Sequence, residues 1–299
     1  MASKVFRRKR IQDWMWGYLM VLPIVVGTTI FSIIPLIQSF YLSFTKWGAF
    51  GSYSWGGLRN FERMLADPNL ALALRNTFVY TVLSVPLSIA ISILVAVLLN
   101  TRIRGVAFYR TLYFLPVVTM PAAVGIVWRW LFNADFGIIN HVLRLVGIEG
   151  PRWLTDPSLA LYSLILVSVW SSIGHNMVIL LSGLQGIPSV YYEAAEIDGA
   201  NNYVQFFRIT LPLLSPTLFF VTVTSLISAF QVFELIFLMI GPDSLVIRQT
   251  QSVVFLFYRE AFINMDKGYA SAISLLLFII IMAVTVVQFR LQKRWVHYE

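Results

Sequence analysis

The sequence contains no cysteine and few charged residues, and the lack of cysteine excludes several kinds of site. Without cysteine the chain has no disulfide, no thiolate nucleophile and no thiolate metal ligand. His141, His175 and His297 lie far apart in the sequence and form no H-E-x-x-H motif. We therefore expect no bound metal and no catalytic residue in this chain.

Lysine is also scarce, which bears on nucleotide binding. The five lysines follow Ser3, Arg8, Thr45, Asp266 and Gln292. A Walker A loop has glycine directly before its lysine. We therefore expect that this chain does not bind ATP through such a loop.

Apolar residues, in contrast, are abundant. Hydrophobic residues make up 58% of the 299 and charged residues 12%, against about 45–50% and about 25% in soluble domains. Six runs contain no charged residue: 14–45, 76–101, 111–128, 157–192, 209–233 and 268–289. A membrane-spanning helix needs about 20 mostly apolar residues. We predict an all-α polytopic membrane protein, a single transmembrane domain over 1–299 with six spans near 15–44, 76–100, 109–132, 159–184, 212–240 and 268–290.

The basic residues suggest an orientation in the membrane. The densest cluster directly precedes the first span and consists of Lys4, Arg7, Arg8, Lys9 and Arg10. Lysine and arginine near span ends favour the cytoplasmic side. We predict that both termini are cytoplasmic, and we prefer this interpretation to a nucleic-acid-binding patch. The first apolar run is too long for the core of a cleaved signal peptide, so we predict that it is a retained span.

The longest inner connection, 185–211, carries the most specific pattern. Pro188-Ser189 is a helix-start signal in which the serine oxygen can cap free N–H groups. Gly199 suits the left-handed residue that ends a helix, and Asn201 or Asn202 suits the start of another. We predict two short helices joined at a glycine corner, the second ending before Pro212. The residues alone leave two interpretations open, a partner-docking element or a solvated connector.

A resemblance favours docking. Glu193-Ala194-Ala195, then Gly199, then Ile209-x-Leu211-Pro212 resembles the EAA loop of binding-protein-dependent ABC importers. The flanking segments resemble the carbohydrate branch, similar to the maltose-type and glycerol-3-phosphate-type sugar permeases: 183–188 before the loop, 128–132 in the third span, 230–236 in the fifth and 267–272 at the entry to the sixth.

The resemblance implies a type I ABC importer permease of a bacterial or archaeal cell membrane. It implies that the chain works with two cytoplasmic ABC ATPases and with a second homologous permease subunit in a heterodimer. It also implies an extracytoplasmic binding protein that delivers a sugar or oligosaccharide. ATP and Mg are expected on the ATPases, with no cofactor bound by this chain. The loop would be the coupling helix, through the residues Glu193, Ala194, Ala195, Asp198, Gly199 and Ala200.

Polar groups inside spans are the candidates for solute contact, because such groups are costly and usually face the bundle interior. In the fifth span Phe230, Gln231 and Glu234 have the spacing of one helix face. A ring, an amide and a carboxylate suit a sugar. In the fourth span Trp170, His175 and Asn176 form a second polar and aromatic patch. The alternative for both sets is a gate or a bond between helices, and Arg129 is expected to extend outward from the membrane.

Other functions remain open on the sequence. An intramembrane enzyme would need clustered acids or histidines at an interface, and Glu193, Glu196 and Asp198 are the only cluster. An ion-coupled secondary transporter usually carries several buried acids or broken helices in an inverted repeat. A permease for a solute other than sugar is a further alternative, and the sequence does not identify the sugar.

Overall fold

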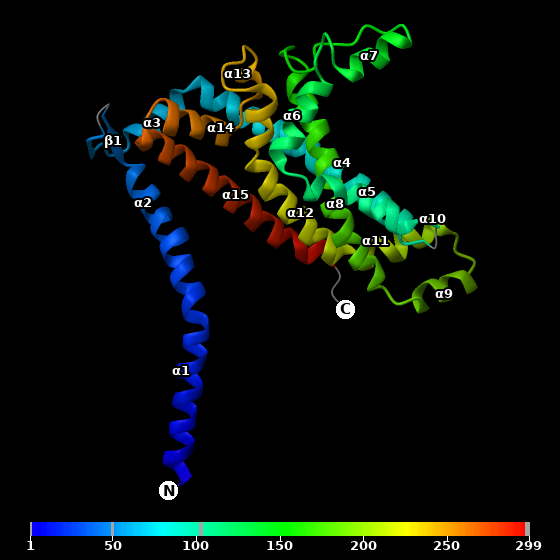
Figure 1. The fold of residues 1–299 in the computed structure, drawn as a ribbon. Coiled ribbons are helices and arrows are strands. Elements are labelled where there is room, and N and C mark those ends of the chain that lie inside the picture. The colour runs from blue at the N-terminus through cyan, green and yellow to red at the C-terminus, as the bar shows by residue number, and fades with distance from the viewer. Residues whose placement is uncertain (1, 49–50, 102–103, 297–299) are drawn as a thin grey trace. The chain divides into compact units, whose positions relative to one another are not determined.

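The computed structural model describes residues 2–48, 51–101 and 104–296, with side chains described from Trp14 onward. The described chain is helical apart from one two-stranded hairpin (Figure 1), which confirms the predicted all-α class. Four helices are long and apolar enough to cross a membrane, and the number rises to six when each of two bent helix pairs is counted as one span. The chain packs as two compact units, and the prediction of one domain stays a prediction.

The first unit comprises the N-terminal segment to Leu65 together with Glu260–Leu275. Its elements are α1 (Ala2–Thr28), the π-helical turn η1 (Thr29–Ile33), α2 (Ile34–Leu42), β1 (Thr45–Trp47), β2 (Tyr53–Trp55), α3 (Arg59–Ala66), the π-helical turn η4 (Arg259–Ile263) and the start of α15 (Lys267–Trp295). The strands pair antiparallel with Lys46 opposite Ser54. Trp14–Leu42 is an apolar span with no residue buried within the chain, so its side chains are available to lipid or to another protein.

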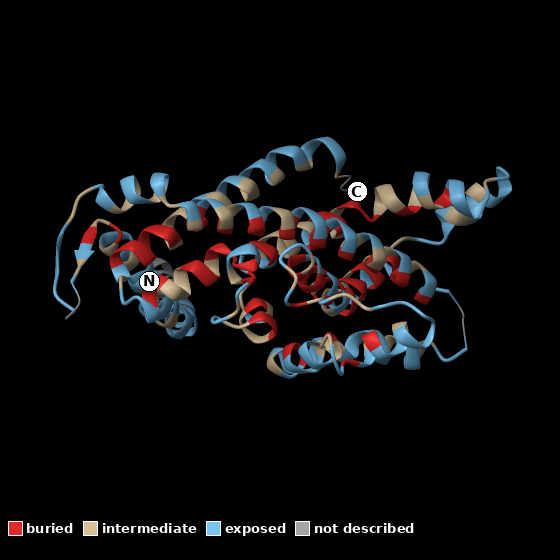
Figure 2. Ribbon diagram, turned by 90° about the horizontal axis from the view of Figure 1, so that it is seen from above, coloured by how far each residue is buried: buried red, intermediate tan, exposed pale blue. Residues whose placement is uncertain are grey.

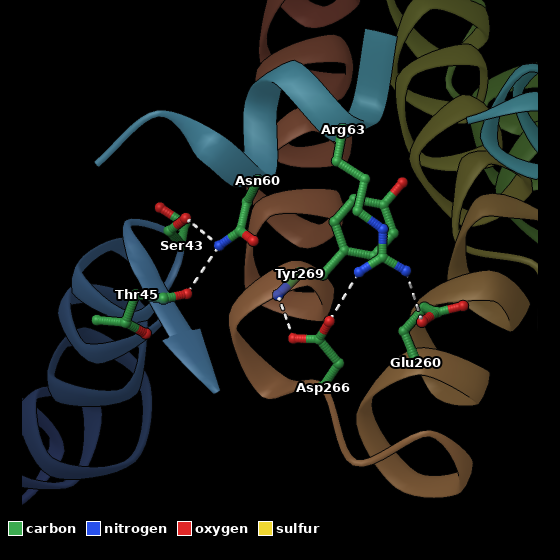
Figure 3. Close-up of polar contacts among 7 residues, drawn as sticks. All are labelled: Ser43, Thr45, Asn60, Arg63, Glu260, Asp266 and Tyr269. Carbon is green, nitrogen blue, oxygen red and sulfur yellow. Dashed lines mark hydrogen bonds and ion pairs between the residues drawn. The ribbon is translucent and has the colours of Figure 1, made fainter. Parts of the chain in front are cut away.

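Polar contacts join the hairpin, α3, η4 and the start of α15 (Figure 3). Asn60 donates its side-chain amide to the carbonyl oxygens of Ser43 and Thr45 at 2.8 and 2.9 Å. Arg63 lies 2.8 Å from the Asp266 carboxylate and 3.5 Å from that of Glu260. The Arg63 guanidinium also covers the Tyr269 ring, 3.7 Å from its centre. One arginine on α3 therefore holds two segments that are about two hundred residues away in sequence.

The second unit comprises Ala66–Arg259 and the chain from Leu276 onward. It contains α4 (Pro68–Leu99), α5 (Val106–Val118), α6 (Pro121–Leu131), α7 (Ile138–Leu145), α8 (Ala160–Gln185), α9 (Val190–Ile197), α10 (Asn202–Gln205), α11 (Leu211–Leu213), α12 (Ser215–Phe230), α13 (Ile247–Thr250), α14 (Val253–Tyr258), and the π-helical turns η2 (Phe206–Thr210) and η3 (Ile236–Ile240). The short helices α7, α13 and α14 lie in the connections between spans.

The core of the second unit forms where α4 packs against α8 and α12, and α5 also packs against α8. Figure 2 shows that buried positions follow the facing sides of these packed helices. The buried face of α4 is lined by small polar residues at helical spacing: Thr77, Thr81, Ser84, Ser88 and Ser92. Small residues let membrane helices approach closely. Two of these hydroxyls donate to carbonyls of α4 itself, Ser88 to Val85 at 3.0 Å and Ser92 to Ser88 at 2.6 Å.

Two of the predicted spans are bent in the structure. The predicted span 109–132 is split into α5 and α6, which meet at an angle of 99°. Thr119 and Met120 between them are extended, with ψ of 135° and 127°. Pro121 explains the break, because a residue before proline is disfavoured in the helical region.

The predicted span 212–240 also differs from the structure. Its helix α12 ends at Phe230, and residues 231–233 are not helical. The Val232 carbonyl accepts a hydrogen bond from the Ser252 hydroxyl at 2.5 Å, so the broken backbone has a partner. At the other end α12 continues a helical segment that begins at Asn202 and bends by 67°.

Candidate functional sites

The loop 185–211 folds as the predicted pair of short helices with a glycine corner between them. Gly199 has a φ of +79° and ends α9. The Ala200 N–H donates to the Ala195 carbonyl at 2.9 Å and the Gly199 N–H to the Glu196 carbonyl at 3.0 Å. This pair of bonds is a Schellman motif, which closes a helix end on itself. The Asn201 side chain then caps α10 by accepting from the Val204 N–H at 2.9 Å.

Two details of the predicted loop are wrong. Ser189 precedes α9 in a helical conformation and makes no side-chain cap, because its own backbone has already entered the turn. The second helix also does not end before Pro212. It continues through η2 into α11, and Pro212 lies at the start of α11, just after the π-helical turn.

Helix α9 presents a mixed apolar and acidic surface to its surroundings. Val190 and Ile197 are 62% and 87% exposed, and Ala194 between them is also exposed. Glu193, Glu196 and Asp198 are exposed, and Ala195 and Ala200 are half-buried. Tyr192 anchors the helix, since its hydroxyl lies 3.0 Å from the Thr210 hydroxyl. The predicted coupling residues therefore occupy one short, internally braced element whose apolar side chains have no cover in this chain.

A cavity of about 460 Å³ lies between α4, α8 and the end of α12, and we call it the serine-lined cavity. Its hydroxyl-bearing lining residues are Tyr80, Ser84, Ser88, Ser168, Ser172, Thr224, Ser225 and Ser228. Its remaining polar lining residues are His175, Asn176, Gln231 and Glu234. The cavity offers many hydroxyls, two amides and one carboxylate, a set that can hydrogen-bond a hydroxyl-rich solute.

Four of the six predicted solute-contact residues line this cavity and two do not. His175 and Asn176 come from α8, and Gln231 and Glu234 from the break after α12. Phe230 is buried and does not line the cavity. Trp170 points elsewhere, with its ring against Trp128 at 5.3 Å in an edge-to-face arrangement.

The predicted common helix face of Phe230, Gln231 and Glu234 is wrong. The helix ends at Phe230, so the three- and four-residue spacing does not apply across the break. Gln231 and Glu234 reach the same cavity because the chain turns there. The carboxylate and amide come together as expected, but for a different reason.

The sequence interpretation missed the serines, which are half of the polar residues in the lining. Their signal was present in α4, where Ser84 and Ser88 are four residues apart within an apolar span. Asn176 is the most enclosed of the predicted residues, 2% exposed, and its side-chain Nδ2 has no hydrogen-bond partner among the described residues. A buried unpaired amide costs about 1–3 kcal/mol, so its position at the cavity wall suits a ligand contact.

A second cavity of about 710 Å³ lies in the same unit, and we call it the arginine-lined cavity. Arg129, expected to extend outward, is exposed and lines it together with Arg152, Asp135 and Asp243. The two cavities lie at opposite ends of η3. The serine-lined cavity includes Leu235 and the arginine-lined cavity includes Met239 and Ile240.

The family described as binding-protein-dependent transport system inner membrane component matches residues 11–297. The chain belongs to this family. This transport component is therefore a multi-pass membrane protein, as the apolar helices indicate.

The similarity to known relatives covers nearly the whole of this chain. The probable ABC transporter permease protein YesP of Bacillus subtilis (strain 168) is 39% identical over 291 residues, covering 96% of this chain and 94% of that protein. The sn-glycerol-3-phosphate transport system permease protein UgpA of Agrobacterium fabrum (strain C58 / ATCC 33970) is 34% identical over 302 residues, covering 100% of both chains.

Solved structures show the same fold. A chain of a bacterial ABC transporter involved in the import of the acidic polysaccharide alginate has a TM-score of 0.85 and 23% identity, covering 97% of this chain and 98% of that one. The alginate transporter in complex with an alginate pentasaccharide-bound periplasmic protein gives 0.85 and 22%, covering 96% of both chains. The likeness confirms the predicted type I importer fold.

Proposed function

We propose that this chain is the membrane-spanning permease half of an ATP-driven ABC importer that translocates a sugar or oligosaccharide. The observation that carries the proposal is the braced α9–α10 corner, an EAA loop whose apolar side chains are exposed within a chain of the permease family. The names of the relatives support an ABC permease, and two of the solved relatives handle a polysaccharide.

The coupling step follows from the corner's geometry. Val190, Ala194 and Ile197 would seat in a groove of a cytoplasmic ATPase, because exposed apolar surface of this kind gains free energy on burial. Glu193, Glu196 and Asp198 would add polar anchors around that contact. The Schellman motif and the Asn201 cap keep the two helices at a fixed angle, so that movement of the ATPase passes to α12 instead of being absorbed by a flexible loop.

The serine-lined cavity is the proposed solute site. Its lining holds donors and acceptors for hydroxyl groups, with Asn176 Nδ2 and the Glu234 carboxylate at fixed places on its wall. The cavity is in the size range of small-molecule sites, about 300–1,000 Å³. Ring-stacking by Phe230 or Trp170 forms no part of the proposal.

The proposed partners are those of an ABC importer permease. The chain would pair with a second, homologous permease as a heterodimer, with two ABC ATPases on the cytoplasmic side and an extracytoplasmic binding protein that delivers the solute. ATP and Mg would bind to the ATPases and not to this chain. Both termini would lie in the cytoplasm of a bacterial or archaeal cell whose membrane the chain spans several times.

The test is transport by the reconstituted complex. Vesicles carrying this chain with its co-purifying permease and ATPases are loaded with ATP and given the binding protein and a panel of radiolabelled neutral and acidic oligosaccharides. The expected result is uptake of a saccharide that requires both ATP and the binding protein and persists when ionophores abolish ion gradients. Uptake that does not require ATP and that an ionophore abolishes would instead support an ion-coupled carrier.

A further inference from the structure

The arginine-lined cavity is separate from the proposed solute site, and no residue lines both. Its lining comes from the end of α6, the connection from α6 to α8, and the segment from η3 to Ser244. The π-helical turn η3 therefore stands between the two cavities, contributing to the lining of the second with Met239 and Ile240. A volume of about 710 Å³ is also in the range of small-molecule sites.

The charged groups of this cavity are balanced and unpaired. Arg129 and Arg152 bring two guanidinium groups, and Asp135 and Asp243 bring two carboxylates. None of these four groups lies within ion-pair distance of an opposite charge among the described residues. Hydrogen bonds to charged groups are the stronger kind, about 1.5–3 kcal/mol each.

The floor of the cavity is apolar. Phe132 and Leu154 line it and are both buried, 3% and 9% exposed. Packing against Trp128 and Trp153, at ring distances of 5.2 and 5.3 Å, fixes the Phe132 ring in place. Charged donors and acceptors around a rigid aromatic floor match the two faces of a sugar ring, its hydroxyl edge and its C–H face.

We propose that the arginine-lined cavity is a second saccharide subsite, which binds one uncharged sugar unit before that unit enters the serine-lined cavity. The C–H face of the unit packs against the floor formed by Phe132 and Leu154, while its hydroxyls donate to Asp135 and Asp243 and accept from Arg129 and Arg152. Equal numbers of guanidinium and carboxylate groups favour a neutral unit over an anionic one. This inference rests on the proposed function.

The absence of native cysteine makes the test specific. Ser244 lines the cavity, so Ser244→Cys introduces one reactive thiol there. Glu149 is exposed on the connection from α7 to α8 and lies outside the lining, so Glu149→Cys is the matched control. Each variant complex is reconstituted without the binding protein and labelled with a charged thiol reagent, with and without maltose, cellobiose, xylobiose or digalacturonate.

The expected result is that a neutral disaccharide slows labelling of Ser244→Cys and leaves Glu149→Cys unchanged. Adding Arg129→Gln or Asp243→Asn raises the protecting concentration about tenfold, as expected for the loss of one charge-assisted hydrogen bond. Protection is expressed relative to each variant's own labelling rate without sugar, because removing a charge beside Ser244 changes that rate. An unchanged melting temperature shows that each variant still folds.

Uptake by the wild-type complex separates two kinds of failure. If a saccharide is transported but does not protect Ser244→Cys, the second subsite is wrong and the proposed function stands. Protection that survives both charge-removing substitutions also overturns the subsite, as does stronger protection by digalacturonate than by the neutral sugars. If no saccharide is transported and none protects, the proposed function and the subsite both fail.

Discussion

At Gly199 the backbone has a φ of +79°, a conformation that costs an L-residue other than glycine roughly 1–2 kcal/mol. Asparagine tolerates this conformation better than β-branched residues do. A Cβ at this position meets nothing within 4 Å, so the strain of a substitution would come from the backbone alone. The corner between α9 and α10 therefore depends on a residue type and not on packing.

We predict that Gly199→Val weakens coupling and that Gly199→Asn does so far less. Valine would relax the corner and rotate the exposed face of α9 away from the ATPase. The measurement is ATPase co-purified per mole of permease, together with ATP-dependent uptake. Membrane insertion should remain normal in both variants, and equal behaviour of the two would contradict a role for the corner's geometry.

Asn176 provides a second prediction, because its buried Nδ2 has no partner among the described residues. Asn176→Leu removes this unpaired donor from the wall of the serine-lined cavity. We expect the variant to melt at the same or a higher temperature while uptake falls about tenfold or more, as a solute hydrogen bond is lost. A matched control is Ser171→Ala, also on α8, where a buried unpaired hydroxyl lies outside the cavity lining. Unchanged uptake is expected there, and an equal loss in both variants would argue for a packing effect.

Among the elements, α3 contacts η4 and the start of α15 through the side chain of Arg63. Arg63 bonds to Asp266 at 2.8 Å, approaches Glu260 at 3.5 Å and covers the Tyr269 ring (Figure 3). The Glu260 side chain is only 6% exposed, so removing the arginine leaves a buried carboxylate without this cation. Lysine keeps the charge but lacks the planar group that can bond two carboxylates and stack on a ring.

We predict that Arg63→Gln destabilises the first unit by about 1–3 kcal/mol, the cost of depriving a buried charged group of a partner. Arg63→Lys should recover part of this loss. Thermal unfolding in detergent, followed by limited proteolysis of the connection between α2 and α4, would measure both effects. Arg59→Gln on the same helix, where the side chain forms no ion pair among the described residues, should leave stability unchanged.

Some features of the fold could be predicted from local sequence, and others depend on contacts between residues far apart in the chain. The corner at Gly199 was predictable because a Schellman motif is set by the residues within it. The break at Pro121 had a signal in the proline itself, which a count of charge-free residues does not register. The break after Phe230 was not predictable, because its stabilising partner is the Ser252 hydroxyl, twenty residues away.

Over the whole molecule, the sequence predicted the class and four polar residues of the serine-lined cavity, but not how the helices assemble around that cavity. Charge-free apolar runs indicate the spans, because a membrane-spanning helix needs about 20 mostly apolar residues. The serine-lined cavity instead forms only where α4, α8 and the end of α12 meet. The residue pattern within α4 does not predict which helix packs against Ser84. The orientation of the chain in the membrane is likewise set by charge on both sides of the spans and not by any single segment.

The orientation itself can be measured, because each engineered cysteine in this chain is unique. We predict that Glu149→Cys and Asp243→Cys react with an impermeant thiol reagent in intact cells or spheroplasts, since both lie in connections assigned to the outside. Ile197→Cys and Asn202→Cys, exposed on the α9–α10 corner, should react only after the membrane is opened. All four side chains are exposed in this chain, so in cells that express it without the ATPases a difference in labelling reports the side of the membrane and not burial. The reverse pattern would place the corner outside, beyond reach of any cytoplasmic ATPase, and the coupling proposal would then fail along with the orientation.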